Sequence, residues 1–245
     1  MNKKIIGIIG GMGPEATASL YMKIIRATHV ERDQDHFRVI IDSNPKVPDR
    51  TSAILYGGES PVNTLVGMGK NLEKLNVDIA LLPCITSHYF IKEVQNQLSI
   101  PIINALEELN NYIKSYYPNV TKIGVLATSG TIKSGLFEKF IKDIEIIIPS
   151  PPSQERKVMK AIYGEKGIKA GNIEGQPLEL LISASNELIQ EGAELIIAGC
   201  TEVGLVLDSH HISKPLIDPM DVIVELVIRE VESSPPTQDK SMPTL

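Results

Sequence analysis

The sequence predicts an α/β protein of two pseudosymmetric domains, each a mostly parallel sheet flanked by helices. Short runs rich in Ile, Leu and Val alternate along the chain with stretches in which apolar residues have helical spacing. This alternation is typical of right-handed βαβ units around a parallel sheet. The same pattern begins again near the middle of the chain, at 122–127. Aromatic residues make up only 4% of the chain, so the core is expected to be aliphatic, as in parallel sheets.

Three landmarks recur at almost the same spacing in the two halves. Their offsets are 117, 116 and 114 positions. Apolar runs resemble one another by chance, but such close agreement across unrelated local motifs favours two copies of one unit. The paired landmarks are Gly7 with Gly124, Cys84 with Cys200, and Pro101 with Pro215.

Each half is expected to supply four strands joined by helices. Apolar runs place the strands at 4–9, 37–42, 77–82 and 101–104, and again at 122–127, 144–148, 193–199 and 215–218. Helical spacing places helices at 14–27, 62–75, 86–95, 105–117, after 130, and at 155–163, 178–191 and 220–231. The segment 43–60 is expected to be a long loop, 164–171 a glycine-rich loop and 233–245 a flexible tail.

Composition argues against several classes of function. A net charge of −6 without a basic cluster disfavours nucleic acid or an anionic membrane as a partner. No apolar stretch approaches the ~18 residues of a membrane span, and the N-terminal segment 1–10 is typical of a first strand rather than of a signal peptide. We therefore expect a reducing, cytoplasmic compartment and no disulfide between Cys84 and Cys200.

Cys84 and Cys200 are the two cysteines of the chain, and each lies where an expected strand passes into a helix. Ligands of open α/β sheets bind beyond the carboxyl ends of the strands, where both thiols lie. If the two halves face each other, the thiols can point at one small molecule from opposite sides. Two opposed groups of similar acidity can remove a proton from one face of a carbon and return one to the other. That chemistry is racemisation or epimerisation without a cofactor, and the spacing offers no metal site. A single buried cysteine is more often only a small apolar side chain, so the pairing carries this interpretation.

Several polar residues near the strand ends are candidate ligand contacts. Arg50 can hold a carboxylate bidentately, and Lys169 offers a point charge on the glycine-rich loop, although either could be a solvated loop residue. His88 could pair with Cys84, but capping or packing explains it more simply. Hydroxyl groups at the strand ends could contact a ligand or only cap helices; they belong to Thr86, Ser87, Thr128, Ser129 and Thr201.

The segment Gly11–Ala16 fits a G-x-G-x-x-A dinucleotide fingerprint between a strand and a helix, and Asp42 closes the second strand. Two features weaken the match. Pro14 removes an N–H where a pyrophosphate needs donors, and Asp42 lies 26 positions beyond the motif. A nucleotide-dependent oxidoreductase therefore stays only as an alternative.

Six segments in order resemble the aspartate racemase branch of the aspartate/glutamate racemase superfamily, from about Ile5 to about Ile228. They are GIIGGMGP at 7–14, NPKVPDRT at 44–51, PCITSH at 83–88, GVLAT at 124–128, IKAG at 168–171 and GCTE at 199–202. The resemblance implies a homodimeric racemase of aspartate or glutamate that needs no cofactor and has its site in the inter-domain cleft. It also implies a first domain of 1–104 plus 218–232, to which the C-terminal helix returns, and a second domain of 105–217.

The resemblance assigns roles to individual residues. Cys84 and Cys200 would be the catalytic acid/base pair, and the small amino-acid substrate would be bound by Met12, Arg50, Ile85, Thr86, Ser87, Thr128, Lys169 and Thr201. One residue departs from the family pattern, because Ile85 stands where the family usually has Asn. Other possibilities therefore stay open: another amino acid as substrate, a small-dicarboxylate isomerase of the same superfamily, or a non-catalytic amino-acid-binding homologue.

Overall fold

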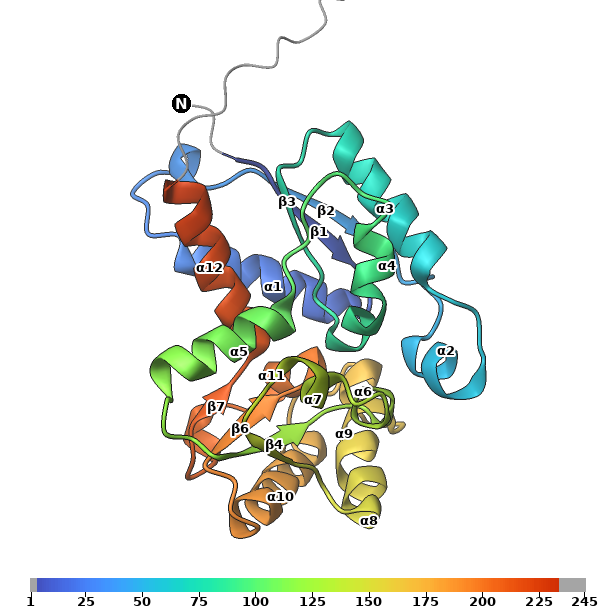
Figure 1. Cartoon of the computed structure of the whole chain (residues 1–245), viewed down its shortest axis with the longest axis vertical. Coiled ribbons are helices and arrows are strands. Elements are labelled where there is room, and N and C mark those ends of the chain that lie inside the picture. The colour runs from blue at the N-terminus through green and yellow to red at the C-terminus, as the bar shows by residue number, and fades with distance from the viewer. Residues whose placement is uncertain (1–3, 234–245) are drawn as a thin grey trace, which may run out of the picture.

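The computed structural model describes residues 4–233, which form two parallel sheets with helices packed on their faces (Figure 1). In the first sheet the strand order is β2-β1-β3, and a single parallel bridge between Ala80 and Ile102 extends it on the β3 side. The second sheet has the order β5-β4-β6-β7. The strands are β1 (Ile6–Gly10), β2 (Val39–Ser43), β3 (Ile79–Leu81), β4 (Lys122–Leu126), β5 (Glu145–Ile147), β6 (Leu195–Ala198) and β7 (Leu216–Ile217).

The two sheets have the same strand order when the bridge at Ile102 takes the place of a fourth strand, which confirms the predicted fold class. The equivalent glycines show why the repeated motif needs them. A β-carbon on Gly7 would lie 2.7 Å from Val77 Cγ1, and one on Gly124 would lie 2.6 Å from Ile196 Cδ1. Each glycine therefore lets neighbouring apolar side chains pack directly against the central strand.

Helices and helical turns cover both sheets. The α-helices are α1 (Pro14–Ala27), α2 (Arg50–Tyr56), α3 (Val62–Lys74), α4 (Ile91–Gln95), α5 (Ala105–Tyr116), α6 (Ser129–Lys133), α7 (Leu136–Phe140), α8 (Pro151–Ser153), α9 (Lys160–Tyr163), α10 (Gln176–Gln190), α11 (Thr201–Val206) and α12 (Pro219–Ser233). The 3₁₀ turns are η1 (Asp33–Asp35), η2 (Ile85–Phe90), η4 (Ile168–Ala170) and η5 (Ser209–His211), and η3 (Gln154–Met159) is a π-helix.

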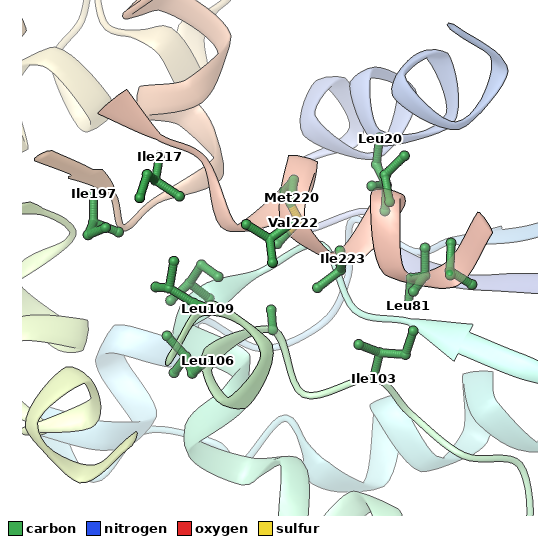
Figure 2. Close-up of a cluster of buried hydrophobic side chains, with 14 of the residues drawn as sticks. Leu20, Leu81, Ile103, Leu106, Leu109, Ile197, Ile217, Met220, Val222 and Ile223 are labelled. Carbon is green, nitrogen blue, oxygen red and sulfur yellow. The ribbon is translucent and has the colours of Figure 1, made fainter. Parts of the chain in front are cut away.

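The two sheets share one hydrophobic core at the place where the chain crosses between them. Helix α5 carries the chain from the first sheet to the second, α12 follows the last strand of the second sheet, and these two helices pack against each other (Figure 1). Figure 2 shows the core around them, with Leu81 of β3 and Ile197 of β6 in the same cluster. The division into 1–104 with 218–232 and 105–217 stays a prediction.

Several predicted elements differ from the structure. The predicted helix at 155–163 is a π-helix followed by α9, and the predicted loop 164–171 contains η4. The segment 43–60 is not a continuous loop, because α2 forms within it: the Asp49 carboxylate accepts a hydrogen bond from the Ser52 N–H at 2.7 Å, and Gly57 ends the helix in the left-handed conformation. The segment 101–104 makes only the bridge at Ile102. The predicted helix at 86–95 is a 3₁₀ turn followed by α4. The predicted tail lies outside the described residues, except for Ser233 at the end of α12.

Candidate active site

The two thiols occupy equivalent places and line one cavity. Cys84 follows β3 and directly precedes η2, while Cys200 follows β6 and directly precedes α11. Both are free cysteines, and each is only 6% exposed. The cavity between them measures about 10 Å³, which is room for roughly one water molecule. Its walls come from both halves: Met12, Asp49, Arg50, Thr51, Cys84, Ile85, Thr86, Thr128, Tyr163, Lys169, Cys200, Thr201 and Glu202.

Of the ten predicted site residues, all but Ser87 line this cavity. Ser87 is fully buried behind the wall, and its hydroxyl donates to Met12 Sδ at 3.5 Å. Four polar lining residues are not among the predicted site residues: Asp49, Thr51, Tyr163 and Glu202. Of these, Glu202 contacts the Cys200 thiol directly.

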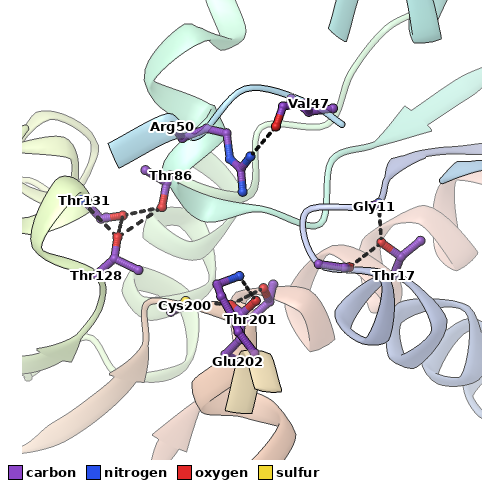
Figure 3. A network of polar contacts seen from close by, with 12 residues as sticks. Gly11, Thr17, Val47, Arg50, Thr86, Thr128, Thr131, Cys200, Thr201 and Glu202 are labelled. Carbon is purple, nitrogen blue, oxygen red and sulfur yellow. Dashed lines mark hydrogen bonds and ion pairs between the residues drawn. The ribbon is translucent and has the colours of Figure 1, made fainter. Parts of the chain in front are cut away.

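Arg50 is held by the backbone of its own loop. Its Nη1 donates to the carbonyl oxygen of Val47 at 3.1 Å (Figure 3). The same atom donates to the carbonyl oxygen of Pro48 at 2.9 Å. Its Nε is buried and has no hydrogen-bond partner among the described residues. Burial opposes the charge, but neighbouring Cys84 and Asp49 outweigh it and raise the pKa of Arg50. A charged guanidinium with a spare buried donor is suited to binding a carboxylate.

Glu202 links Cys200 to Lys169. The Cys200 thiol donates to Glu202 Oε2 at 2.8 Å, and the Lys169 ammonium forms an ion pair with Oε1. Burial alone would raise the pKa of the Glu202 carboxyl, but Lys169 and the hydrogen bond from Cys200 lower it, so the group is ionised. Burial, followed by the charge of Glu202, raises the pKa of the Cys200 thiol well above its usual value.

Three hydroxyl groups join the two halves beside the thiols. The hydroxyl oxygen of Thr86, two residues after Cys84, lies 2.8 Å from that of Thr131 and 3.3 Å from that of Thr128 (Figure 3). Thr128 also caps α6 by accepting the Thr131 N–H. The capping role expected for Thr128 is therefore confirmed, and Thr131 is a partner that the sequence did not indicate.

His88 is a structural residue rather than a partner of the Cys84 thiol. It is 1% exposed, and its Nε2 accepts the Ala105 N–H at 3.1 Å. The proton of the neutral ring must then be on Nδ1, which donates to the Cys84 carbonyl oxygen at 3.0 Å. Burial lowers the pKa of His88 to about 4. The neutral ring thus ties the backbone of Cys84 to the start of α5.

The glycine loop after β1 is used internally. The Gly11 N–H donates to Thr17 Oγ1 at 2.8 Å, and that hydroxyl donates to the Gly13 carbonyl oxygen at 2.9 Å (Figure 3). A β-carbon on Gly11 would lie 2.4 Å from the Asn44 backbone, so the glycine allows two loops to touch. These contacts weaken the dinucleotide interpretation, because the loop N–H that a phosphate would need is already bonded.

Two further observations concern the part of the chain that the structure describes. No group of three or more His, Cys, Asp or Glu side chains within it is arranged to hold a metal ion. None of the helices in 4–233 combines the length and apolar character needed to cross a bilayer.

Solved structures similar to this chain include amino-acid racemases. Picrophilus torridus aspartate racemase superposes with a TM-score of 0.81 at 25% identity, over 94% of each chain. Glutamate racemase from Francisella tularensis shares the fold with a TM-score of 0.68 at 16% identity, over 95% of this chain and 82% of its own. The broad-specificity amino-acid racemase RacX of Bacillus subtilis is 31% identical over 218 residues, which cover 87% of this chain and 92% of RacX.

The chain belongs to the Asp/Glu/hydantoin racemase family, whose model matches residues 9–227. It is an isomerase of the amino-acid racemase class, and the resemblance found in the sequence is confirmed.

Proposed function

We propose that this enzyme interconverts the L and D forms of an acidic amino acid, aspartate or glutamate, by proton transfer between Cys84 and Cys200 without a cofactor. The observation that supports this proposal most strongly is the shared cavity. Two thiols from equivalent strand ends line it together with a guanidinium, Arg50, and an ammonium, Lys169. Two opposed proton carriers and two cations match a substrate with a Cα proton and two carboxylates.

In the proposed reaction one sulfur is a thiolate and the other a thiol. The thiolate removes the Cα proton, and the electron pair of the broken C–H bond is delocalised into the α-carboxylate held by Arg50. The opposite thiol then gives its proton to the other face of the carbon, and its sulfur keeps the electron pair of the S–H bond. The two sulfurs exchange roles in the reverse direction.

The substrate must enter through an opening of this site, because an amino acid does not fit a volume of about 10 Å³. A neighbouring cavity of about 220 Å³ shares Met12, Arg50, Lys169 and Glu202 with the inner one. We propose that this outer cavity is the entrance and that movement of α2 and η4, which carry the two cations, admits the substrate.

A broader substrate range is the second candidate. The RacX relative is described as a broad-specificity amino-acid racemase, and here the apolar Ile85 follows the first cysteine. An apolar wall beside the thiol suits less polar side chains. The small-dicarboxylate isomerase and the amino-acid-binding homologue stay as further alternatives. The cytoplasmic location and the homodimer also remain predictions. Sedimentation velocity tests whether the protein is a dimer.

The proposal is tested by proton NMR of L-aspartate, and then of L-glutamate, with the enzyme in D₂O under reducing conditions. Chiral chromatography of the same samples follows the enantiomers. Loss of the Cα proton signal together with appearance of the D form supports racemisation by two bases. Exchange without inversion would mean that one thiol acts alone. If neither acid reacts, the assay moves to less polar amino acids. Ligand-induced thermal stabilisation without turnover of any amino acid would favour the binding homologue.

A further inference from the structure

The two thiols have different charged neighbours. The Cys200 thiol donates its proton to a carboxylate, Glu202, at 2.8 Å. The neighbour of Cys84 in the cavity is instead the guanidinium of Arg50. The other acidic residue in the cavity wall, Asp49, uses its carboxylate to cap α2 and is exposed. The two halves of the site therefore differ in charge even though their backbones are equivalent.

Glu202 is built to remain a buried carboxylate. It is 4% exposed, and both of its oxygens are used: Oε1 pairs with Lys169, while Oε2 accepts from the Cys200 thiol and from the Thr201 hydroxyl at 3.2 Å. A buried carboxylate is tolerated only when it is paired and hydrogen-bonded in this way. Removing Lys169 would leave the negative charge without its ion-pair partner.

The groups that face Cys200 come from several elements. Glu202 lies on the same helix, Lys169 on η4 and Tyr163 on α9. Cys84 and Arg50 face the same cavity from the other half. Burial raises the pKa of Tyr163 to about 12, so this neighbour is neutral. The carboxylate nearest to the Cys200 sulfur is thus opposed mainly by the single charge of Lys169, which the carboxylate itself binds.

We propose that Glu202 is a positioning residue that keeps Cys200 in the thiol form in the resting enzyme, so that Cys84 is the first base and Cys200 the first acid. The inference rests on the proposed two-thiol reaction. Its consequence is that the resting enzyme accepts the enantiomer whose Cα proton faces Cys84. The opposite enantiomer reacts only after a proton has moved from Cys200 to Cys84.

A preference for the Cys200 thiol form in the resting enzyme has a defined effect on the kinetics. Enantiomers are equal in free energy, so kcat/KM must be the same in the two directions whatever the enzyme does. Unequal stability of the two protonation states instead makes kcat and KM differ between the directions while their ratio stays equal. Loss of the Glu202 charge should bring the two kcat values closer together.

The direct test measures ionisation of Cys200 through its alkylation rate. In a Cys84→Ser background only Cys200 reacts with iodoacetamide, and mass spectrometry follows the rate as a function of pH. The plateau rate reports access to the sulfur, and the midpoint reports thiolate formation. Glu202→Gln is expected to move the midpoint to lower pH by about one unit or more, because the opposing charge is gone and Lys169 is released. Glu202→Asp keeps the charge and should keep the midpoint near that of the parent.

Glu187→Gln is the matched control. Glu187 also pairs with a lysine, Lys157, and accepts from a hydroxyl, Ser153, but it lies outside the cavity. This control should leave the Cys200 midpoint unchanged. An unchanged or higher midpoint in Glu202→Gln would overturn the inference. The titration does not need turnover, so it distinguishes failure of this inference from failure of the proposed racemase, which the NMR assay decides.

Discussion

Thr51 of α2 and Gly130 of α6 touch across the cleft, so closely that the glycine cannot gain a side chain in place. A β-carbon on Gly130 would lie 2.5 Å from Thr51 Oγ1 and 2.9 Å from its Cα. Thr51 directly follows Arg50, so we expect this contact between the two halves to set how far the guanidinium reaches toward the thiols.

Gly130→Ala is expected to push α2 away and to lower kcat/KM by about 10- to 100-fold, because a displacement of about 1 Å in a positioning group has an effect of this size. Steady-state racemisation kinetics measure the effect. Gly67→Ala is the control: this exposed residue of α3 has open space around it, so the variant should keep its activity and gain up to about 1 kcal/mol of stability. Unchanged kinetics in Gly130→Ala would show that the contact does not position Arg50.

The proposed acid/base pair predicts that Cys84→Ser and Cys200→Ser each lower racemisation by at least about 100-fold, since a serine hydroxyl is a far weaker acid than a thiol. Chiral chromatography of product measures the loss. Thermal melting confirms that each variant is folded, as expected for a change of one atom at a free thiol. Full activity in both variants would contradict the mechanism.

Arg50→Lys is expected to raise KM and to lower kcat/KM by about 100-fold. A lysine can keep the charge, but it cannot bond the Val47 and Pro48 carbonyls while presenting a second donor edge to a carboxylate. Initial-rate kinetics with both enantiomers measure the change. Arg32→Lys, at an exposed arginine paired with Asp35, controls for the substitution itself. A wild-type KM in Arg50→Lys would remove Arg50 from substrate binding.

Ile85→Asn is expected to raise the ratio of aspartate turnover to alanine turnover by about 10-fold, because the amide adds hydrogen bonds to a polar substrate. Ile85 is 2% exposed and belongs to the core, so the variant should lose about 3 kcal/mol of stability. Ile85→Val controls for lost packing alone and should leave the ratio unchanged. A falling or constant ratio in Ile85→Asn would show that this position does not select the substrate.

The buried neutral His88 predicts a pH dependence of stability. Its pKa is about 4 in the folded protein, against about 6.5 when exposed, so the unfolded chain binds the proton first as the pH falls. The stabilisation is complete above about pH 6.5 and is lost toward pH 4. Between about pH 7 and about pH 4.5 the wild type should lose roughly 2–3 kcal/mol more unfolding free energy than His88→Gln. Urea titrations at both pH values measure the difference, and equal losses would contradict the assignment.

The fold class was predictable from local patterns, because aliphatic strands and amphipathic helices reflect burial directly. The equivalent placement of Cys84 and Cys200 followed from the repeat. Helix α2 was missed although its signals are local: Asp49 caps its start and Gly57 ends it. The prolines and glycines of the segment 43–60 favoured a loop, and this signal was given more weight than the two helix-end signals.

Glu202 could not be found in the same way. An acidic residue in the first turn of a helix is ordinary, and its importance comes from Lys169, which is 33 positions earlier and reaches it only in the folded protein. Thr131 is similar, because its partner Thr86 belongs to the other half of the chain. Side-chain pairs between the two sheets depend on how the halves face each other, which local spacing does not encode.

The packed helices α5 and α12 lie where a hinge between the two halves of the molecule would lie. Both crossings between the sheets lie at this one edge, and the touching helices α2 and α6 lie at the opposite side of Figure 1. A rotation of one half about this hinge therefore produces a large displacement at α2. The core side chains around this hinge, such as Leu109 and Ile223, then govern how readily the two halves separate, although neither lines the cavity.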